Sequence, residues 1–191
     1  MADINFDNVV TMLEQLPERV TKPARQVANI IKSIKWKSVS FIINTEPEPS
    51  HRPRLCGFRV YVPGAAKHQR FFDKEVLPKL KGLFISTPCI VDIDVYCKTP
   101  SSFTKIQQLL AEQKLIRPWG NVGDVDNFCK TVLDAMCTNE KRNMRGILPD
   151  DCIVIESRTR KFYSQSPRYE VHIKYMDDIS DDLKKLIRFK F

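Results

Sequence analysis

The sequence predicts a single α+β domain over residues 1–191, with a mixed β-sheet flanked by helices and an extra helical segment at the N-terminus. Runs rich in β-branched and aromatic residues, which favour strands, occur among segments whose apolar residues recur at helical spacing. The chain has 191 residues, of which 42% are hydrophobic and 28% charged. These values are typical of one globular domain that can bury its own core.

Residues 1–36 are expected to form a helical extension of two helices. Pro17 separates their apolar patterns, and Pro23 suits the first turn of the second helix. Two interpretations of this segment stay open. It either packs on the core as an extra layer or serves as a dimer or DNA-binding extension, since it carries several lysines and arginines.

The remaining elements follow from apolar periodicity and from turn residues. Strands are expected at residues 38–45, 57–62 and 88–97, and residues 152–163 and 168–175 are expected to pair as a β-hairpin. Helices are expected at residues 65–80, 101–114 and 125–138, and a last helix at 176–191.

The charge and cysteine content limit the class of protein. A formal net charge of +8 suits an anionic partner, either nucleic acid or a membrane surface. No membrane partner is expected, because no run of about 18 apolar residues occurs and the N-terminus is unlike a signal peptide. The six cysteines form no C-x-x-C pair and the three histidines do not cluster with them, so zinc is not expected. Reduced cysteines in apolar runs favour the cytoplasm.

The most informative stretch runs from Gly123 to Asp151. Asp124 and Asp126 stand where a helix is expected to begin. Lys130 and Asp134 follow Asp126 at spacings of four, so Asp126, Lys130 and Asp134 share one helix face. The apolar residues of this segment fall on the other side, where they can be buried.

A second acidic pair, Asp150 and Asp151, precedes the strand-like run 152–155. Crowded carboxylates repel one another unless a proton or a cation neutralises them. Mg²⁺ favours a few carboxylate oxygens together with water and phosphate. A metal ion held in this way can activate water and neutralise a phosphodiester. The acids therefore indicate a metal site, and a lysine on the same face can stabilise developing charge.

These residues resemble the core motif of the RusA family of Holliday-junction resolvases. The strings D-V-D-N-F-C-K at 124–130, L-D-A at 133–135 and P-D-D-C-I at 149–153 are similar to the family's D-x-D-N-x-x-K, its downstream D-A and its later D-D before an apolar strand. Further segments agree in order: Arg52-Pro53-Arg54, Val62-Pro63, Lys161 and Pro167-Arg168. The resemblance covers roughly residues 37–175, which would form the core between the N-terminal extension and the last helix.

The resemblance implies a magnesium-dependent endonuclease that resolves four-way DNA junctions in recombination and repair. Mn²⁺ would be able to replace Mg²⁺, and no small-molecule cofactor is expected. The active unit would be a homodimer, which suits a two-fold-symmetric substrate that is nicked on two strands. The expected location is the cytoplasm of a prokaryotic or phage-infected cell.

The same resemblance assigns roles to individual residues. The catalytic set would be Asp124, Asp126, Lys130 and Asp151, of which the three acids bind metal together with Asp150. The DNA backbone would be held by Arg52, Arg54 and Lys161. We add Lys67 to these DNA contacts for a different reason, because it lies near the start of the helix expected at 65–80, where a phosphate could bind. The positions directly before Asp124, where family members often have a basic residue, hold Asn121, Val122 and Gly123.

Several of these residues also have a purely structural interpretation. Asp124 is well placed to cap the helix, and Lys130 could simply pair with Asp126 on the helix surface. Asp134 is expected to support Lys130 and not to bind metal. Trp119 fits either a packed loop hinge or a surface on which a base stacks.

A rival acidic pair occurs at Asp92 and Asp94, on one face of an expected strand. We leave this pair out of the site, because no second acidic pair follows it and the resemblance does not mark it. Three other functions stay open. They are a non-catalytic DNA-binding or architectural protein, a metal-dependent nuclease that acts on flaps, single strands or RNA, and a basic scaffold that binds protein partners.

Overall fold

The computed structural model describes residues 6–16, 24, 25, 27–29, 31, 32, 34–50, 54–56, 59–61, 65–140, 143 and 145–176. The chain divides into two compact units, one formed by residues 1–37 with 176–191 and the other by residues 38–175. The helix expected at 176–191 lies outside the described residues, apart from Met176 at the end of a strand.

The described residues of the smaller unit before position 33 are mostly helical. Helix α1 spans Phe6–Glu14, and the described residues between 24 and 32 are also helical. Val10, Ala24 and Ala28 are buried, and Lys32 forms an ion pair with Glu14 at 3.3 Å. The two expected N-terminal helical segments are therefore present.

The larger unit is built on a four-stranded mixed sheet with the order β1-β6-β4-β5. Its strands are β1 (Trp36–Ile43), β4 (Cys89–Lys98), β5 (Val154–Ser164) and β6 (Arg168–Met176). Strand β5 runs parallel to β4, whereas β6 runs antiparallel to it. A separate antiparallel pair consists of β2 (Arg54–Cys56) and β3 (Arg59–Tyr61). The α+β prediction with a mixed sheet is confirmed.

The expected β-hairpin of residues 152–163 and 168–175 is wrong. Both strands exist, but β4 lies between them and pairs with each. Seven of the ten residues of β4 are buried, and Val91, Ile93 and Val95 are fully so. A strand of this kind belongs in the centre of a sheet, paired along both edges. The short connection 165–167 therefore joins two strands that are not paired with each other.

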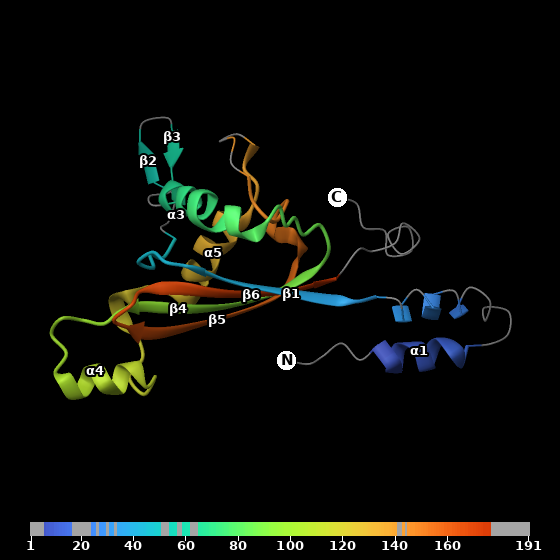
Figure 1. Ribbon diagram of the computed structural model, residues 1–191, viewed down its shortest axis with the longest axis horizontal. Coiled ribbons are helices and arrows are strands. Elements are labelled where there is room, and N and C mark those ends of the chain that lie inside the picture. Colours follow the sequence, from blue (N-terminus) through green and yellow to red (C-terminus); the bar gives the residue numbers. More distant parts are fainter. Residues whose placement is uncertain are drawn as a thin grey trace. The chain divides into compact units, whose positions relative to one another are not determined.

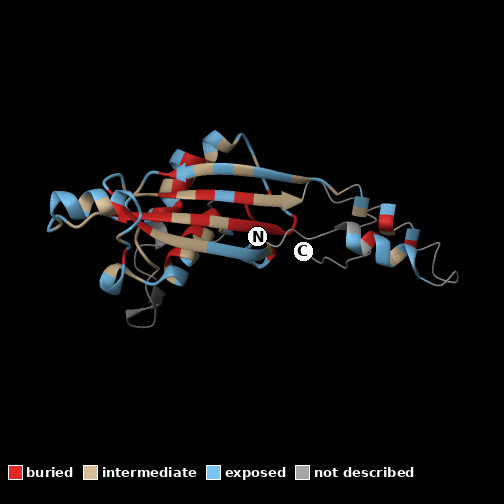
Figure 2. Cartoon of the chain, turned by 90° about the horizontal axis from the view of Figure 1, so that it is seen from below, coloured by how far each residue is buried: buried red, intermediate tan, exposed pale blue. Residues whose placement is uncertain are grey.

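Helices cover both faces of the sheet. Figure 1 shows α3 (Ala65–Phe71) and α5 (Val125–Met136) on one side, and α4 (Lys105–Glu112) on the other. The main core lies under α5, where Phe128, Val132 and Met136 are buried together with β4 and β6. Figure 2 shows that the buried residues concentrate in the central strands.

Two expected helices differ in their bounds. The helix expected at 65–80 is α3 followed by a π-helical segment, η1 (Phe72–Val76), and a 3-10 turn, η2 (Leu77–Leu80). Helix α4 begins at Lys105 and not at Ser101, because Thr104 and Gln107 form a capping box there. Within the described ranges, no helix has both the length and the apolar character needed to cross a membrane.

Candidate active site at helix α5

Helix α5 presents one buried face and one polar face, as its sequence predicts. Phe128, Val132 and Met136 pack into the core, whereas Asp126 and Lys130 are exposed. Nζ of Lys130 lies 3.1 Å from Oδ1 of Asp134, one turn further along. The expectation that Asp134 supports Lys130 is therefore confirmed.

Asp124 occupies the N-cap position of α5, but its side chain makes no capping hydrogen bond. Only its carbonyl oxygen takes part in the helix, accepting from the N–H of Phe128 at 3.3 Å. The interpretation of Asp124 as a simple side-chain cap is therefore wrong. Among the described residues, no hydrogen bond or ion pair involves the carboxylate of Asp124 or that of Asp126. Two exposed carboxylates thus stand at the start of this helix, close to the positive end of its dipole.

The charge on Lys130 is favoured by its surroundings. Its pKa is raised, first by the hydrogen bond to Asp134 and also by the negative charges of Asp134 and Asp151. Asp151 is thus close enough to Lys130 to act on it. An ammonium with a raised pKa stays protonated at neutral pH, so Lys130 can act as a cation but is a poor general base.

The second acidic pair lies at a short 3-10 turn, η5 (Asp151–Ile153). Oδ1 of Asp150 accepts a hydrogen bond from the N–H of Cys152 at 2.9 Å, and this bond lowers the pKa of Asp150. The charges of Asp151 and Asp150 also act on Cys137, which follows α5. Burial is the main cause that raises the pKa of Cys137, to about 12. Leu148, two residues before Asp150, pairs with Cys137, so the acidic pair follows a segment that is held at the C-terminal end of α5.

The expected metal ligands come from two segments of the chain. Asp124 and Asp126 stand at the first turn of α5, whereas Asp151 acts on Lys130 and Cys137 further along. In the part of the chain that the structure describes, no three or more His, Cys, Asp or Glu side chains are gathered as a metal site. The donor chemistry of the first pair nevertheless fits magnesium, which typically uses one or two carboxylates with water and substrate phosphates.

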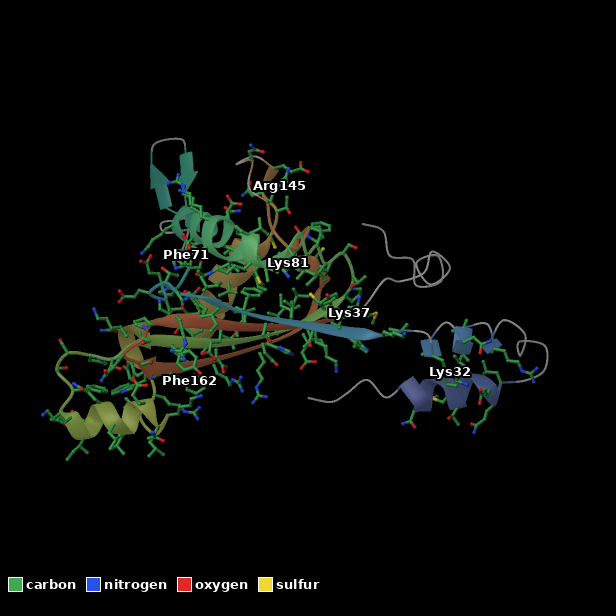
Figure 3. All side chains as sticks on the ribbon, in the orientation of Figure 1. Lys32, Lys37, Phe71, Lys81, Arg145 and Phe162 are labelled. Carbon is green, nitrogen blue, oxygen red and sulfur yellow. The ribbon has the colours of Figure 1, made fainter. Side chains whose placement is uncertain are left out.

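The loop that carries the second pair is held against the end of α5. The N–H groups of Ile147 and Leu148 both donate to the carbonyl oxygen of Met136, at 2.9 and 3.1 Å. A Cβ added to Gly146 would lie 2.2 Å from that same oxygen, so only glycine fits there. Arg145, labelled in Figure 3, lies on this loop. The close approach at Gly146 fixes where Asp150 and Asp151 emerge.

Lys161 reaches the other end of the site. Its Nζ donates a hydrogen bond of 2.6 Å to the carbonyl oxygen of Gly123, the residue before Asp124. An ammonium has three donors, so this bond leaves capacity for a phosphate. The structure therefore adds a positioning role for Lys161 that its place on a strand did not suggest, and its contact with DNA stays a prediction.

A proline-rich segment crosses the first half of α5. The N–H of Ser50 donates to the carbonyl oxygen of Asn127 at 3.0 Å. The Thr131 hydroxyl donates to the carbonyl oxygen of Glu48 at 3.1 Å. The Tyr169 hydroxyl donates to that same oxygen and accepts from the N–H of Glu48. We call residues 46–50 the strap; nothing in their composition identified these partners.

The strap also lies against the loop before Asp124, and it binds Lys67, one of the residues expected to hold DNA. Gly123 has φ +104, and a Cβ there would lie 2.7 Å from the ring of Pro49. Lys67 forms an ion pair with Glu48. Arg52 lies outside the described residues, and only the backbone of Arg54 is described, in β2. The strap thus ends directly before the expected arginine contacts.

The rival pair Asp92 and Asp94 lies away from this site. Both alternate along β4 with the core residues that face α5, so they point to the opposite face of the sheet. Asp94 is also paired with Arg160, at 2.5 Å. Leaving these two acids out of the candidate site agrees with their positions.

Exposed carboxylates, a protonated lysine and a positively charged chain together are typical of a hydrolase that cleaves phosphodiester bonds in nucleic acid. Comparisons with known proteins also indicate a hydrolase of this kind, and they identify its family. Residues 44–174 match the family described as "Endodeoxyribonuclease RusA". The chain belongs to the RusA family, which confirms the resemblance, and it is a nuclease of the hydrolase class.

A relative is similar over nearly its whole length. The protein YqaN of Bacillus subtilis (strain 168), which is described as uncharacterized, is 32% identical over 143 residues. These residues cover 71% of this chain and 95% of that protein.

Proposed function

We propose that this protein is a magnesium-dependent endonuclease that resolves four-way DNA junctions by hydrolysing two phosphodiester bonds. The observation that carries the proposal is the pair of exposed carboxylates, Asp124 and Asp126, with no protein partner among the described residues. Such a pair is costly beside a phosphate unless a cation binds there. Membership of the RusA family supports branched DNA as the substrate.

Asp124 and Asp126 would hold the magnesium ion, and Asp151 with Asp150 would contribute from the adjacent turn. When bound, magnesium lowers the pKa of a water molecule and neutralises charge on the phosphate. The protein itself positions the two exposed carboxylates. Helix α5 fixes Asp126, whereas the hydrogen bond from Lys161 to Gly123 and the closeness of Gly123 to Pro49 fix the loop that ends at Asp124.

Lys130 would stabilise negative charge on the phosphate. Its raised pKa keeps Lys130 protonated. Nζ of Lys130 lies 3.1 Å from Oδ1 of Asp134, and this contact holds the ammonium on the surface of α5. A fixed cation of this kind stabilises the transition state without having to reorganise. Lys130 would thus act in the same catalytic set as Asp124, Asp126 and Asp151.

Arg52, Arg54, Lys67 and Lys161 would hold the DNA backbone on either side of this set. Lys67 pairs with Glu48 of the strap, and Lys161 bonds to Gly123 beside Asp124. We also propose a homodimer, because a four-way junction has two-fold symmetry and paired nicks need two active sites. The biological role would be resolution of junctions during recombination and repair.

The test is cleavage of a synthetic four-way junction in Mg²⁺, beside linear duplex, flap and single-stranded DNA of matched sequence. Symmetric paired nicks in the junction, absent in EDTA, are expected. Cleavage of flaps or single strands with an intact junction would assign another nuclease substrate. Binding of the junction without cleavage in any divalent metal would instead favour an architectural protein.

A further inference from the structure

Trp119 is unusually exposed for its type. It lies in the loop that leads to Asp124, and 82% of its surface is accessible. Its neighbour Pro118 is buried, so the loop is anchored while the indole projects away. The interpretation of Trp119 as a packed hinge residue is therefore wrong, and its place five residues before Asp124 calls for another explanation.

Two cations next to this loop keep their charge available. Nζ of Lys114 lies 4.4 Å from the ring centre of Phe162, and the Arg117 guanidinium lies 5.4 Å from the same ring. Phe162 lies on β5, on the side of the sheet that carries α4 (Figure 3). Among the described residues, neither cation has a carboxylate within ion-pair distance. Stacking on an aromatic ring orders a cation and leaves its charge unneutralised.

We propose that Trp119 stacks on an unpaired base of the DNA substrate, while Lys114 and Arg117 hold phosphates of the same strand. Every base offers a π-face to an exposed aromatic ring, and flanking cations follow the backbone. This proposal rests on the proposed function, because the strand would be the one that reaches Asp124. Base stacking is interrupted where the arms of branched DNA meet, so a base can leave its pair there at a lower cost than inside a duplex.

The position of Trp119 suits this task. Five residues span at most about 17 Å of chain, and a strand rises about 3.4 Å per nucleotide. A base on Trp119 would thus lie within about five nucleotides of a phosphate at Asp124. Stacking at that distance would place a branch point relative to the scissile bond.

A protein partner is the other occupant to consider. Ile106, Leu109 and Leu115 on and after α4 are also exposed, at 72%, 62% and 73%. We favour DNA because, among the described residues, no carboxylate forms an ion pair with Lys114 or Arg117, and because the chain carries a net charge of +8. The test below separates the two occupants.

The first measurement is tryptophan fluorescence of the full chain in EDTA, where no cleavage occurs. The chain has two tryptophans, so Trp36→Phe leaves Trp119 as the sole emitter. Adding a 12-nucleotide oligo-dT or a four-way junction is expected to quench its emission. Unchanged emission at a concentration where anisotropy shows bound DNA would overturn the proposal.

The second measurement compares affinities of variants for oligo-dT, junction and linear duplex. Trp119→Ala is expected to weaken oligo-dT and junction binding roughly 5- to 100-fold and to leave duplex binding unchanged, whereas Trp119→Phe retains most of the affinity. Lys114→Ala with Arg117→Ala is expected to make the salt dependence of oligo-dT binding less steep by about 1.4. Circular dichroism confirms that each variant is folded.

The control variant is Leu109→Ala, which removes an exposed apolar residue of α4 without touching the loop. It is expected to bind all three DNAs normally. If Trp119→Ala and Leu109→Ala both change the oligomeric state and neither changes DNA affinity, the surface binds protein and the proposal fails. Because binding is measured without metal, absence of junction cleavage by the wild type would refute the proposed function and leave this test intact.

Discussion

Nζ of Lys161 donates a 2.6 Å hydrogen bond to the carbonyl oxygen of Gly123, and so joins strand β5 to the residue that precedes Asp124. The bond spans two segments that are 38 residues apart in the chain. It gives the exposed loop before α5 a fixed attachment to the sheet. The orientation of Asp124 therefore depends on a side chain from a distant strand.

Lys161→Met tests this attachment. We expect the free energy of unfolding to fall by about 1 kcal/mol, because a hydrogen bond from a half-buried ammonium is lost. Cleavage is expected to fall more than junction binding, and the salt dependence of binding to become less steep by about 0.9, as for one lost phosphate contact. Urea unfolding measures the stability, anisotropy measures junction binding and its salt dependence, and the junction assay measures cleavage.

The matched control is Lys98→Met, which removes an exposed lysine from the end of β4. It is expected to leave stability and cleavage unchanged. If Lys161→Met matches this control in all three measurements, Lys161 has neither the positioning role nor the DNA contact.

Asp134→Asn tests how the charge of Lys130 is maintained. Asp134 raises the pKa of Lys130 above its ordinary value of 10.5. A raised pKa in the folded state means that the pair stabilises the protein below pH 10.5 and that this contribution is lost as the pH rises above it. The pair is exposed, so its loss is expected to cost only about 0.3–0.5 kcal/mol at neutral pH.

The effect on activity is expected to be clearer. If Lys130 must be protonated, the cleavage rate falls on the alkaline side as Lys130 loses its proton. Asp134→Asn is expected to move that fall to lower pH, and Lys130→Arg to move it to higher pH. A rate profile from pH 8 to 11 that is identical in wild type and Asp134→Asn would contradict the role of the pair.

Gly146→Ala tests the close contact that fixes the second acidic pair. The added Cβ would lie 2.2 Å from the backbone oxygen of Met136, and backbone cannot move aside cheaply. We expect a loss of about 1–3 kcal/mol in the free energy of unfolding, with reduced cleavage because Asp151 is displaced. Urea unfolding measures the first effect. Arg145→Ala, at the exposed neighbouring position, should be stable, and equal stability of the two variants would argue against the contact.

Tyr169→Phe tests the strap. The lost hydroxyl donates to the carbonyl oxygen of Glu48 and accepts from its N–H. We expect destabilisation of about 1–3 kcal/mol, because a part-buried N–H loses its partner, together with faster amide exchange in residues 46–50. Thr131→Val, which removes a second bond to the same oxygen, should act in the same direction. Unchanged exchange in both variants would show that these hydroxyls do not hold the strap.

Local patterns in the sequence were enough to predict the fold class and helix α5. The apolar spacing of Phe128, Val132 and Met136 specifies which face of α5 is buried, and that face lies on the sheet as expected. The i,i+4 spacing of Lys130 and Asp134 likewise predicts the contact that the structure contains. Interactions within a few residues of one another can be read in this way.

Long-range pairing could not be predicted in the same way. The sequence places β5 and β6 on either side of a short turn, which is typical of a hairpin, yet the apolar strand β4 pairs with both. Nor does any local pattern show that Lys161 would reach Gly123 or that Tyr169 would hold Glu48. These contacts depend on the order of the strands, which is a property of the whole domain.

The acidic residues of the motif were predicted from the sequence, and their gathering around one metal ion stays a prediction. In the structure Asp124 and Asp126 stand at the start of α5, and Asp151 acts on Lys130 further along. The spacing of residues shows which of them share a helix face, but it does not show where the turn with Asp150 and Asp151 lies relative to α5.

The most direct test of the central claim is four-way junction cleavage by Asp126→Asn in Mg²⁺, with junction binding measured in EDTA. Cleavage is expected to fall by more than about 100-fold, while binding is retained or tightened because a negative charge beside phosphate is removed. Asp92→Asn is the matched control, since it makes the same change in the D-x-D pair on the other face of the sheet. Unchanged cleavage by Asp126→Asn, or an equal loss in Asp92→Asn, would contradict the assignment of the active site to helix α5.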